Sequence, residues 1–166
     1  MRTLYLVRHG KSSWADPRQS DFDRPLNARG ERDVPFMAKL FAAKGGPVQL
    51  IVTSPAVRAL TTAHLFADAL DLSNGDLLQE QALYLADVPT LLRVVNALPD
   101  DRPEVMLFGH NPGLTEFVHY LTGGGPDNLP TTGMARIDLP FDSWALASRG
   151  TGELVWLDFP KRHPER

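Results

Sequence analysis

The stretch TLYLVRHGKSSW, Thr3 to Trp14, joins an apolar run directly to charged and polar residues. Its apolar part, LYLV, is the kind of short run that forms a buried strand. Arg8, His9 and Gly10 follow at once, so the strand delivers an arginine and a histidine side by side onto a glycine turn. In open α/β sheets, ligands bind beyond the carboxyl ends of the strands. The stretch therefore predicts a buried strand with a binding site at its end.

Strand and helix signals alternate through the rest of the chain. This alternation is typical of the α/β class and predicts a single-domain, three-layer α/β/α fold, with a mostly parallel sheet and helices on both faces. We expect the domain to span residues 1–160 and the C-terminal tail, 161–166, to fray. Apolar runs predict further strands at 48–54, 105–108, 134–139 and 153–159, and the pairing of the last two is left open. Helices are predicted at 28–44, 55–70, after Pro89 and from Pro112, with Asn27, Ser54 and Asn111 as N-caps.

The composition is ordinary for a globular domain: 166 residues, of which 43% are hydrophobic and 22% charged. A net charge of −3 gives no basic footprint for nucleic acid or an anionic membrane surface. The absence of cysteine excludes disulfides, thiolate nucleophiles and cysteine metal sites. No apolar run approaches the roughly 20 residues that span a bilayer, and no signal-like segment precedes the first strand. A cytoplasmic location is therefore expected.

Three predicted strand ends carry residues suited to an anion. The first gives Arg8 and His9, the second gives Arg58 one helical turn beyond Ser54, and the third gives His110. Paired arginines and helix N-termini bind a tetrahedral phosphate well, and an imidazole among them can attack phosphorus. Each residue alone is more typical of a structural or surface role, so only their coincidence at one sheet edge favours an anion-handling enzyme. A metal site on the two histidines is disfavoured, because it lacks a third ligand and the arginines repel a cation.

Four motifs carry a resemblance to a known family: RHGKSSW, DFDRPLNARGERDVPFMA, SPAVRALTTA and FGHNPG. They extend over most of the chain and resemble the histidine phosphatase superfamily, which has the phosphoglycerate mutase-like fold. Within it they resemble the short SixA-type branch, associated with phosphohistidine phosphatases. The resemblance implies that His9 is the nucleophile and becomes phosphohistidine. It also implies that Arg8 and Arg58 clamp the phosphoryl oxygens and that His110 donates to the same oxygens. No metal and no cofactor are implied.

Attack by His9 sets two physical conditions. The imidazole must be neutral, and nearby arginines favour the neutral form. Its other ring nitrogen needs a fixed acceptor that holds the tautomer, and we expect a backbone carbonyl in that place.

The segment LLQEQALYLADVPTLL departs from the family pattern. Typical members bring a glutamate proton donor in a segment like L-x-E-x-x-Y/F-G, whereas here the glycine is missing and the spacing differs. Glu80 and Asp87 are the candidate acids; the alternatives are a solvated carboxylate for Glu80 and a helix-start carboxylate for Asp87. An imidazole leaving group, with a reference pKa of about 6.5, can already be protonated near neutral pH. The departure therefore fits a phosphohistidine substrate, although it does not exclude phosphate esters.

The favoured hypothesis is a metal-independent phosphatase that works through phospho-His9 on phosphohistidine-containing proteins. One alternative is a small-molecule phosphomonoesterase of the same superfamily. The other is a catalytically weak phosphate- or phosphoprotein-binding module, against which the intact set of arginines and histidines argues.

The loop 11–27 is the expected source of specificity. Lys11 is either a phosphate contact at the mouth of the site or a solvated lysine. Asp21 and Arg24 are expected to pair and hold the loop. From the last loop of the chain, Thr131 and Thr132 are expected to approach the site.

Overall fold

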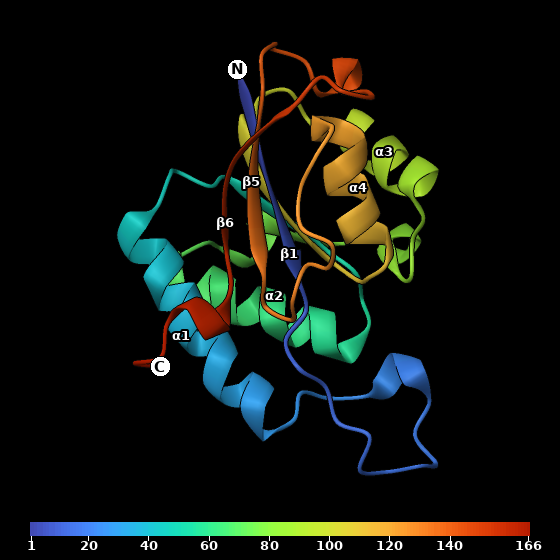
Figure 1. The fold of residues 1–166 in the computed structure, drawn as a ribbon, viewed down its shortest axis with the longest axis vertical. Coiled ribbons are helices and arrows are strands. Elements are labelled where there is room, and N and C mark those ends of the chain that lie inside the picture. Colours follow the sequence, from blue (N-terminus) through green and yellow to red (C-terminus); the bar gives the residue numbers. More distant parts are fainter.

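A six-stranded sheet runs through the computed structural model, which describes residues 1–166 (Figure 1). Its strands lie in the order β3-β2-β4-β1-β5-β6. The neighbours β3, β2, β4 and β1 pair in parallel, whereas β5 is antiparallel to β1 and β6 is antiparallel to β5. This confirms the mostly parallel sheet and supplies the pairing that the sequence left open. The strand bounds are β1 Arg2–Arg8, β2 Leu50–Thr53, β3 Leu77–Gln79, β4 Glu104–Gly109, β5 Met134–Leu139 and β6 Glu153–Asp158.

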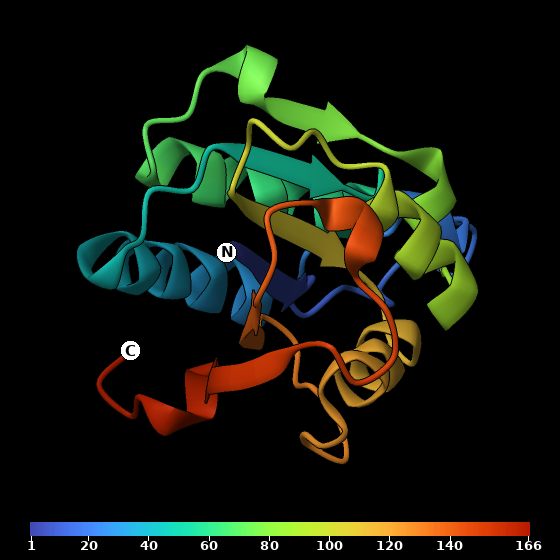
Figure 2. The ribbon, with the colours of Figure 1, turned by 90° about the horizontal axis from the view of Figure 1, so that it is seen from above.

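Two helices cover each face of the sheet, as predicted for a three-layer fold (Figures 1 and 2). The helices α1, Ala28–Lys44, and α2, Val57–Ala69, pack on one face, where Tyr5 and Val7 of β1 point. The helices α3, Val88–Asn96, and α4, Gly113–Thr122, cover the other face. Because strand side chains alternate, Leu4 and Leu6 of β1 are buried against one helical layer and Tyr5 and Val7 against the other. The strand is thereby held between the two layers.

Two of the three predicted N-caps differ from expectation. Asn27 caps α1 as predicted, its side chain accepting from the Gly30 N–H at 2.9 Å. Ser54, however, lies three residues before α2 and forms a 2.8 Å hydrogen bond with Nε2 of His110. The N-cap of α4 is Pro112 rather than Asn111. The Ser54 side chain contacts a distant segment, and the Asn111 side chain contacts both a distant segment and the first turn of α4. Neither residue is the N-cap, and each helix begins later than predicted.

The short strand β3 went unpredicted. With three residues, of which two are exposed, it has too little length to show a periodic pattern. Its backbone pairs in parallel with β2, and only that pairing makes it a strand.

The prediction of a frayed tail is wrong. Nε2 of His163 lies 2.6 Å from the Asp158 carboxylate, and Nε of Arg166 donates to the Asp33 carboxylate at 3.0 Å. Both aspartates are almost fully buried. Buried carboxylates require partners, and the basic tail residues provide them.

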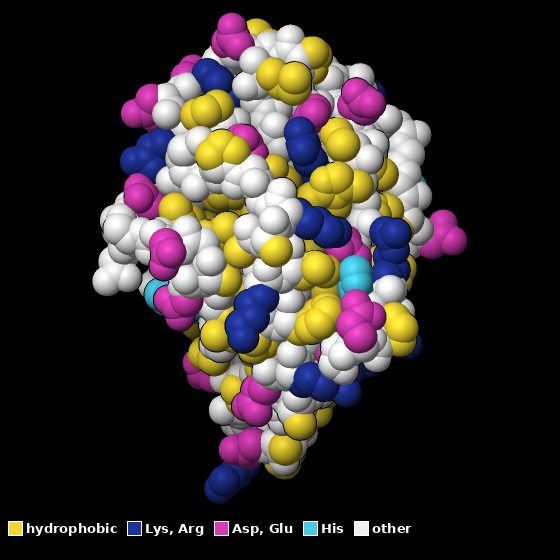
Figure 3. Space-filling model, turned by 90° about the vertical axis from the view of Figure 1, so that its left-hand side faces the viewer, with side chains coloured by type: hydrophobic (Ala, Val, Ile, Leu, Met, Phe, Trp, Pro, Cys, Tyr) yellow, Lys and Arg dark blue, Asp and Glu magenta, His cyan; other side chains and the backbone are white.

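Charges of both signs are mixed over the surface. The chain has 17 Lys and Arg and 20 Asp and Glu. On the face shown in Figure 3 they are interspersed among apolar and neutral side chains. None of the helices combines the length and apolar character needed to cross a membrane.

Candidate active site

The two predicted histidines meet because their strands are neighbours. In the parallel pair of β1 and β4, Arg8 lies opposite Gly109, so His9 and His110 leave the sheet at the same level. Their ring centroids are 5.2 Å apart. Two residues separated by about a hundred positions in sequence thus form one cluster at the carboxyl ends of the strands.

His9 is held as a neutral ring with one free nitrogen. Its Nδ1 lies 2.7 Å from the carbonyl oxygen of Gly10. A carbonyl oxygen can only accept a hydrogen bond, so Nδ1 must carry the proton. Nε2 then carries the lone pair. The pKa of His9 is lowered to about 3, mainly by burial and further by His110, Arg58 and Arg8. Both expected conditions are met: the acceptor is a backbone carbonyl, and the arginines favour the neutral ring, although burial has the larger effect.

Gly10 is required by close packing. A Cβ at this position would lie 2.5 Å from Cγ2 of Val34 and 3.0 Å from Cδ2 of Leu26. The Gly10 N–H also donates to Oγ1 of Thr62 on α2 at 3.0 Å. The turn after β1 is therefore fastened from both sides, which fixes the carbonyl that orients His9.

We infer the opposite tautomer for His110. Oγ of Ser54 accepts from the Ala56 N–H at 3.2 Å, and its own hydrogen finds an acceptor only in Nε2 of His110, 2.8 Å away, so we assign the hydroxyl as the donor of that bond. Nδ1 is then the protonated nitrogen, and it is buried without a hydrogen-bond partner. The pKa of His110 is lowered to about 4 by burial, Arg58 and Arg8, against the opposing effect of Asp21. A neutral His110 therefore offers one unpaired N–H donor.

Each of the two predicted arginines is anchored by its terminal nitrogens. Nη1 of Arg8 donates to the Leu129 carbonyl at 3.0 Å. Nη1 and Nη2 of Arg58 donate to the backbone oxygen and the carboxylate of Asp21, at 2.6 and 3.0 Å. The Nε atoms of both arginines are buried and have no partner. Buried donors are nearly always paired in proteins, so unpartnered ones beside a neutral imidazole indicate a site for an oxyanion.

Three features that support this cluster were not predicted from the sequence. They are the hydrogen bond between Ser54 and His110, the contact of Asp21 with Arg58, and the role of Tyr84. The hydroxyl of Tyr84 donates to Oδ2 of Asp21 at 2.6 Å, and its ring lies 5.4 Å from that of His110. The predicted pair of Asp21 and Arg24 is confirmed at 2.9 Å. Asp21 stood in the quoted DFDRPL motif, and Tyr84 stood in the quoted segment LLQEQALYLADVPTLL, which the sequence marked only for its carboxylates.

The loop before β5 reaches the site as expected for Thr132. Its backbone N–H donates to the carbonyl oxygens of both Arg8 and His9, at 3.0 and 3.1 Å. Its side chain is buried, with Oγ1 unpartnered. The contact fixes the backbone from which Arg8 and His9 project.

The remaining predicted residues make other contacts. Asp87 is the N-cap of α3 and accepts from the Thr90 N–H at 3.0 Å. Glu80 accepts from the Ala82 N–H at 3.3 Å and lines a cavity of about 470 Å³ beside β2, β3 and α3. The Lys11 side chain is exposed. No group of three or more His, Cys, Asp or Glu side chains is arranged to hold a metal ion.

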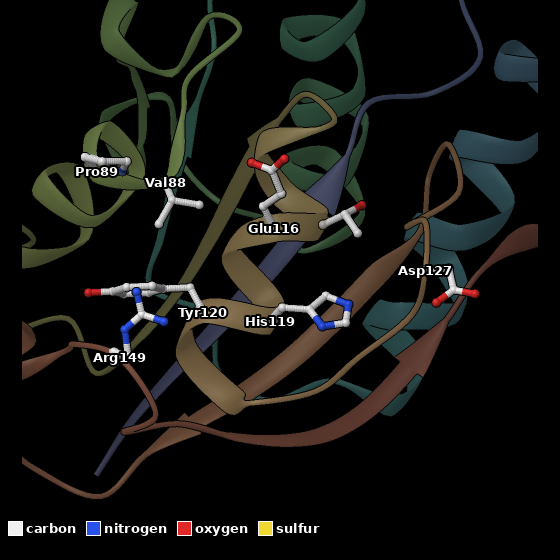
Figure 4. A pocket seen from close by; sticks show the side chains of 8 residues that line it. Val88, Pro89, Glu116, His119, Tyr120, Asp127 and Arg149 are labelled. Atoms are coloured by element: carbon white, nitrogen blue, oxygen red, sulfur yellow. The ribbon is translucent and has the colours of Figure 1, made fainter.

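A cavity of about 710 Å³, which neither His9 nor His110 lines, lies along the outer side of α4 (Figure 4). The guanidinium of Arg149 stacks over the ring of Tyr120 at 4.9 Å, and Nε2 of His119 lies 2.7 Å from the Pro126 carbonyl. None of the predicted site residues lines it. Its lining residues are Val88, Pro89, Thr115, Glu116, His119, Tyr120, Asp127 and Arg149.

The lowered pKa values of His9 and His110 predict a pH-dependent stability. Below the ordinary histidine pKa of about 6.5, the unfolded chain binds protons at both rings, while the folded protein does not until about pH 3 to 4. The free energy of unfolding should therefore fall as pH decreases from 6.5 to 4, with His9 alone accounting for about 3 kcal/mol. Urea unfolding of the wild type and His9→Asn across this range checks it, with exposed His64→Asn as the matched control. Equal slopes for wild type and His9→Asn would contradict the buried neutral ring.

Comparison with known proteins assigns the cluster to a family. The model of the histidine phosphatase superfamily, branch 1, matches residues 4–84, which include most of β1 and the whole of α1, β2, α2 and β3. The structure of SixA from Agrobacterium tumefaciens superimposes with a TM-score of 0.80 at 27% identity, covering 96% of this chain and 98% of that one. The chain belongs to the histidine phosphatase superfamily. It is a phosphatase of the SixA type, with the phosphoglycerate mutase-like fold.

Other relatives extend the similarity along the whole chain. An uncharacterised chloroplast protein of Arabidopsis thaliana is 30% identical over 163 residues, which cover 93% of this chain and 74% of that protein. The structure of the protein histidine phosphatase SixA complexed with tungstate has a TM-score of 0.82 at 23% identity and covers 96% of this chain and 98% of that one, which shows a shared fold.

Proposed function

We propose that this phosphatase works through a phosphohistidine intermediate on His9, and that proteins carrying phosphohistidine are its favoured substrates. One observation carries the proposal. The unprotonated Nε2 of His9 belongs to a cluster in which Nε of Arg8, Nε of Arg58 and Nδ1 of His110 are buried donors without a protein partner. This arrangement supports the roles of His9 as nucleophile and of the two arginines and His110 as oxyanion donors.

The proposed reaction has two steps. In the first, the Nε2 lone pair of His9 forms a bond to phosphorus as the bond to the leaving group breaks, and the leaving group departs with a proton. Arg8, Arg58 and His110 donate to the phosphoryl oxygens, where negative charge must be held during transfer. In the second step, water attacks phosphorus, inorganic phosphate leaves, and His9 returns to its neutral form with Nε2 free.

The choice of substrate rests on the proton that the leaving group needs. An alcohol requires a general acid, but the two candidate carboxylates, Glu80 and Asp87, accept hydrogen bonds from backbone N–H groups at 3.3 and 3.0 Å. The hydrogen bonds from Thr90 lower the pKa of Asp87, which disfavours the protonated form that a general acid requires. An imidazole with a reference pKa of about 6.5 can leave already protonated. This supports phosphohistidine over an alkyl phosphate ester.

A panel of carboxylate variants tests the substrate proposal. We expect Glu80→Gln and Asp87→Asn each to lower kcat/KM on a phosphohistidine protein by less than about threefold, since loss of a true general acid costs about 10²–10⁴-fold. The wild type should also cleave the phosphohistidine protein faster than an alkyl phosphate. Release of inorganic phosphate from both substrates gives the measurement, and Glu116→Gln, an exposed carboxylate on α4, is the matched control.

Two outcomes would contradict the proposal. A large loss on both substrates from one variant would identify an obligatory acid and remove the chemical argument for phosphohistidine. Faster wild-type hydrolysis of the alkyl ester would make the protein a small-molecule phosphomonoesterase.

A further inference from the structure

We propose that Asp21 and Tyr84 are positioning residues that orient the guanidinium of Arg58 for the phosphoryl group. The inference rests on the proposed function, because it concerns the same site. It deepens that function by naming two residues, on two separate loops, that set the geometry of the oxyanion donors without touching the reacting atoms.

The first step is the geometry of the guanidinium. A planar guanidinium has one edge formed by its two Nη atoms and a second edge that includes Nε. Asp21 occupies the first edge, through its backbone oxygen on Nη1 and its carboxylate on Nη2. The Nε edge is left unpartnered and buried. Asp21 therefore selects which edge of Arg58 is available for a bidentate contact with an oxyanion.

The second step is the way in which Asp21 itself is held. It opens a short 3₁₀ turn, Asp21–Asp23, that begins with Ser20 as N-cap. Its Oδ1 accepts from Nη1 of the buried Arg24 at 2.9 Å, and Nε of Arg24 donates to the Ser13 carbonyl at 3.0 Å. Through Arg24, the turn that carries Asp21 is tied to Ser13 on the other arm of the loop 11–27, which restrains the position of the carboxylate.

The third step is the role of Tyr84. Its hydroxyl donates to the same carboxylate oxygen, Oδ2 of Asp21, that binds Arg58. Its ring meets that of His110 edge to face, at 5.4 Å and 84°, and that of Phe22 at 5.1 Å. One side chain thereby touches the partner of Arg58 and packs against His110, so two of the proposed oxyanion donors share a support.

The charges agree with this arrangement. The hydroxyl of Tyr84 and the two arginines lower the pKa of Asp21 to about 2, so the carboxylate is ionised at neutral pH. Burial and the hydrogen bond to Asp21 raise the pKa of Tyr84, which keeps the hydroxyl protonated as a donor. The pair is therefore in its hydrogen-bonded form throughout the neutral range.

Binding of tungstate, a tetrahedral oxyanion, gives a test whose sign is decisive. Removing a negative charge near an anion site should by electrostatics alone tighten anion binding. Positioning predicts the reverse: Asp21→Asn should raise the tungstate Kd about tenfold, because the donor edge of Arg58 is no longer fixed. Asp23→Asn, on the same turn, is the matched control, since Asp23 bonds only to Ser20. Isothermal titration of the purified protein provides the measurement.

Kinetics complete the test. We expect Asp21→Asn to lower kcat by about 10–10²-fold and Tyr84→Phe to lower it less, as misplaced catalytic groups do. An Arg58→Lys background lacks the planar guanidinium that Asp21 would orient. In that background Asp21→Asn should have little further effect, because the effects of substituting residues that act through one another are not additive. A merely structural role would produce the same loss in both backgrounds and a matching loss of thermal stability.

The outcomes separate this inference from the proposed function. Unchanged or tighter tungstate binding by Asp21→Asn, with the wild type binding normally, would overturn the positioning role whatever the substrate. If tungstate binding weakens as expected but the wild type leaves phosphohistidine proteins intact, the positioning role stands and the substrate proposal fails.

Discussion

His9→Ala is expected to reduce phosphate release to the background of the assay while the protein remains folded. The reason is that His9 holds the one ring nitrogen of the cluster with a free lone pair, and no thiol exists in the chain to replace it. The side chain makes a single hydrogen bond, to its neighbour Gly10, so its removal takes away no hydrogen bond between distant segments. Far-UV circular dichroism and thermal unfolding at pH 7.5 check the fold, and a coupled phosphate assay checks turnover.

The covalent step can be observed directly. Acid-labile, base-stable label from a ³²P-phosphohistidine protein should appear on the wild type in rapid-quench experiments and be absent from His9→Ala. His64→Ala, an exposed histidine on α2, is the control and should be labelled like the wild type. Near-normal turnover by His9→Ala would show that another group attacks phosphorus.

Arg58→Ala should lower kcat/KM by at least about 10²–10³-fold, the usual cost of removing one donor to a developing oxyanion. Arg58 is 3% exposed, its Nε is unpartnered, and its charge lowers the pKa values of His9 and His110, so its substitution removes a clamp and a positive charge together. Arg58→Lys keeps the charge without the fork and should recover only part of the loss. Initial rates at several substrate concentrations measure the effect.

Lys11→Ala provides the comparison within the same site region. Its side chain is exposed, and an exposed charge contributes less than about 1 kcal/mol, so the loss should stay below about fivefold. Thermal unfolding of both variants separates misfolding from lost catalysis. Equal losses from the two substitutions, at equal stability, would refute the placement of Arg58 as the principal clamp.

The local sequence determined the framework of this protein. The four apolar residues before Arg8 lie within β1, and the pattern of apolar runs and helix starts predicted the mostly parallel sheet. Because parallel strands present their carboxyl ends at one edge, residues at the ends of β1 and β4 were expected at the same edge, and the pairing of these two strands brings His9 and His110 together. These features follow from short-range periodicity and from the geometry that any parallel sheet shares, so they can be read without knowing which side chains touch.

Tertiary structure alone decided the partners that give the site its chemistry. Ser54 reads as a helix cap, yet its hydroxyl forms a hydrogen bond with Nε2 of His110, 56 positions away. Tyr84 lies in a segment that the sequence marked only for its carboxylates, yet it bonds to Asp21 across 63 positions, and β3 exists only through pairing with β2. A side-chain hydrogen bond between distant loops depends on distances of a few tenths of an ångström after the whole chain has packed. Local residue patterns contain no such distance, which is why the sequence placed the catalytic candidates while the folded protein fixed their tautomers, their free donors and the supports behind them.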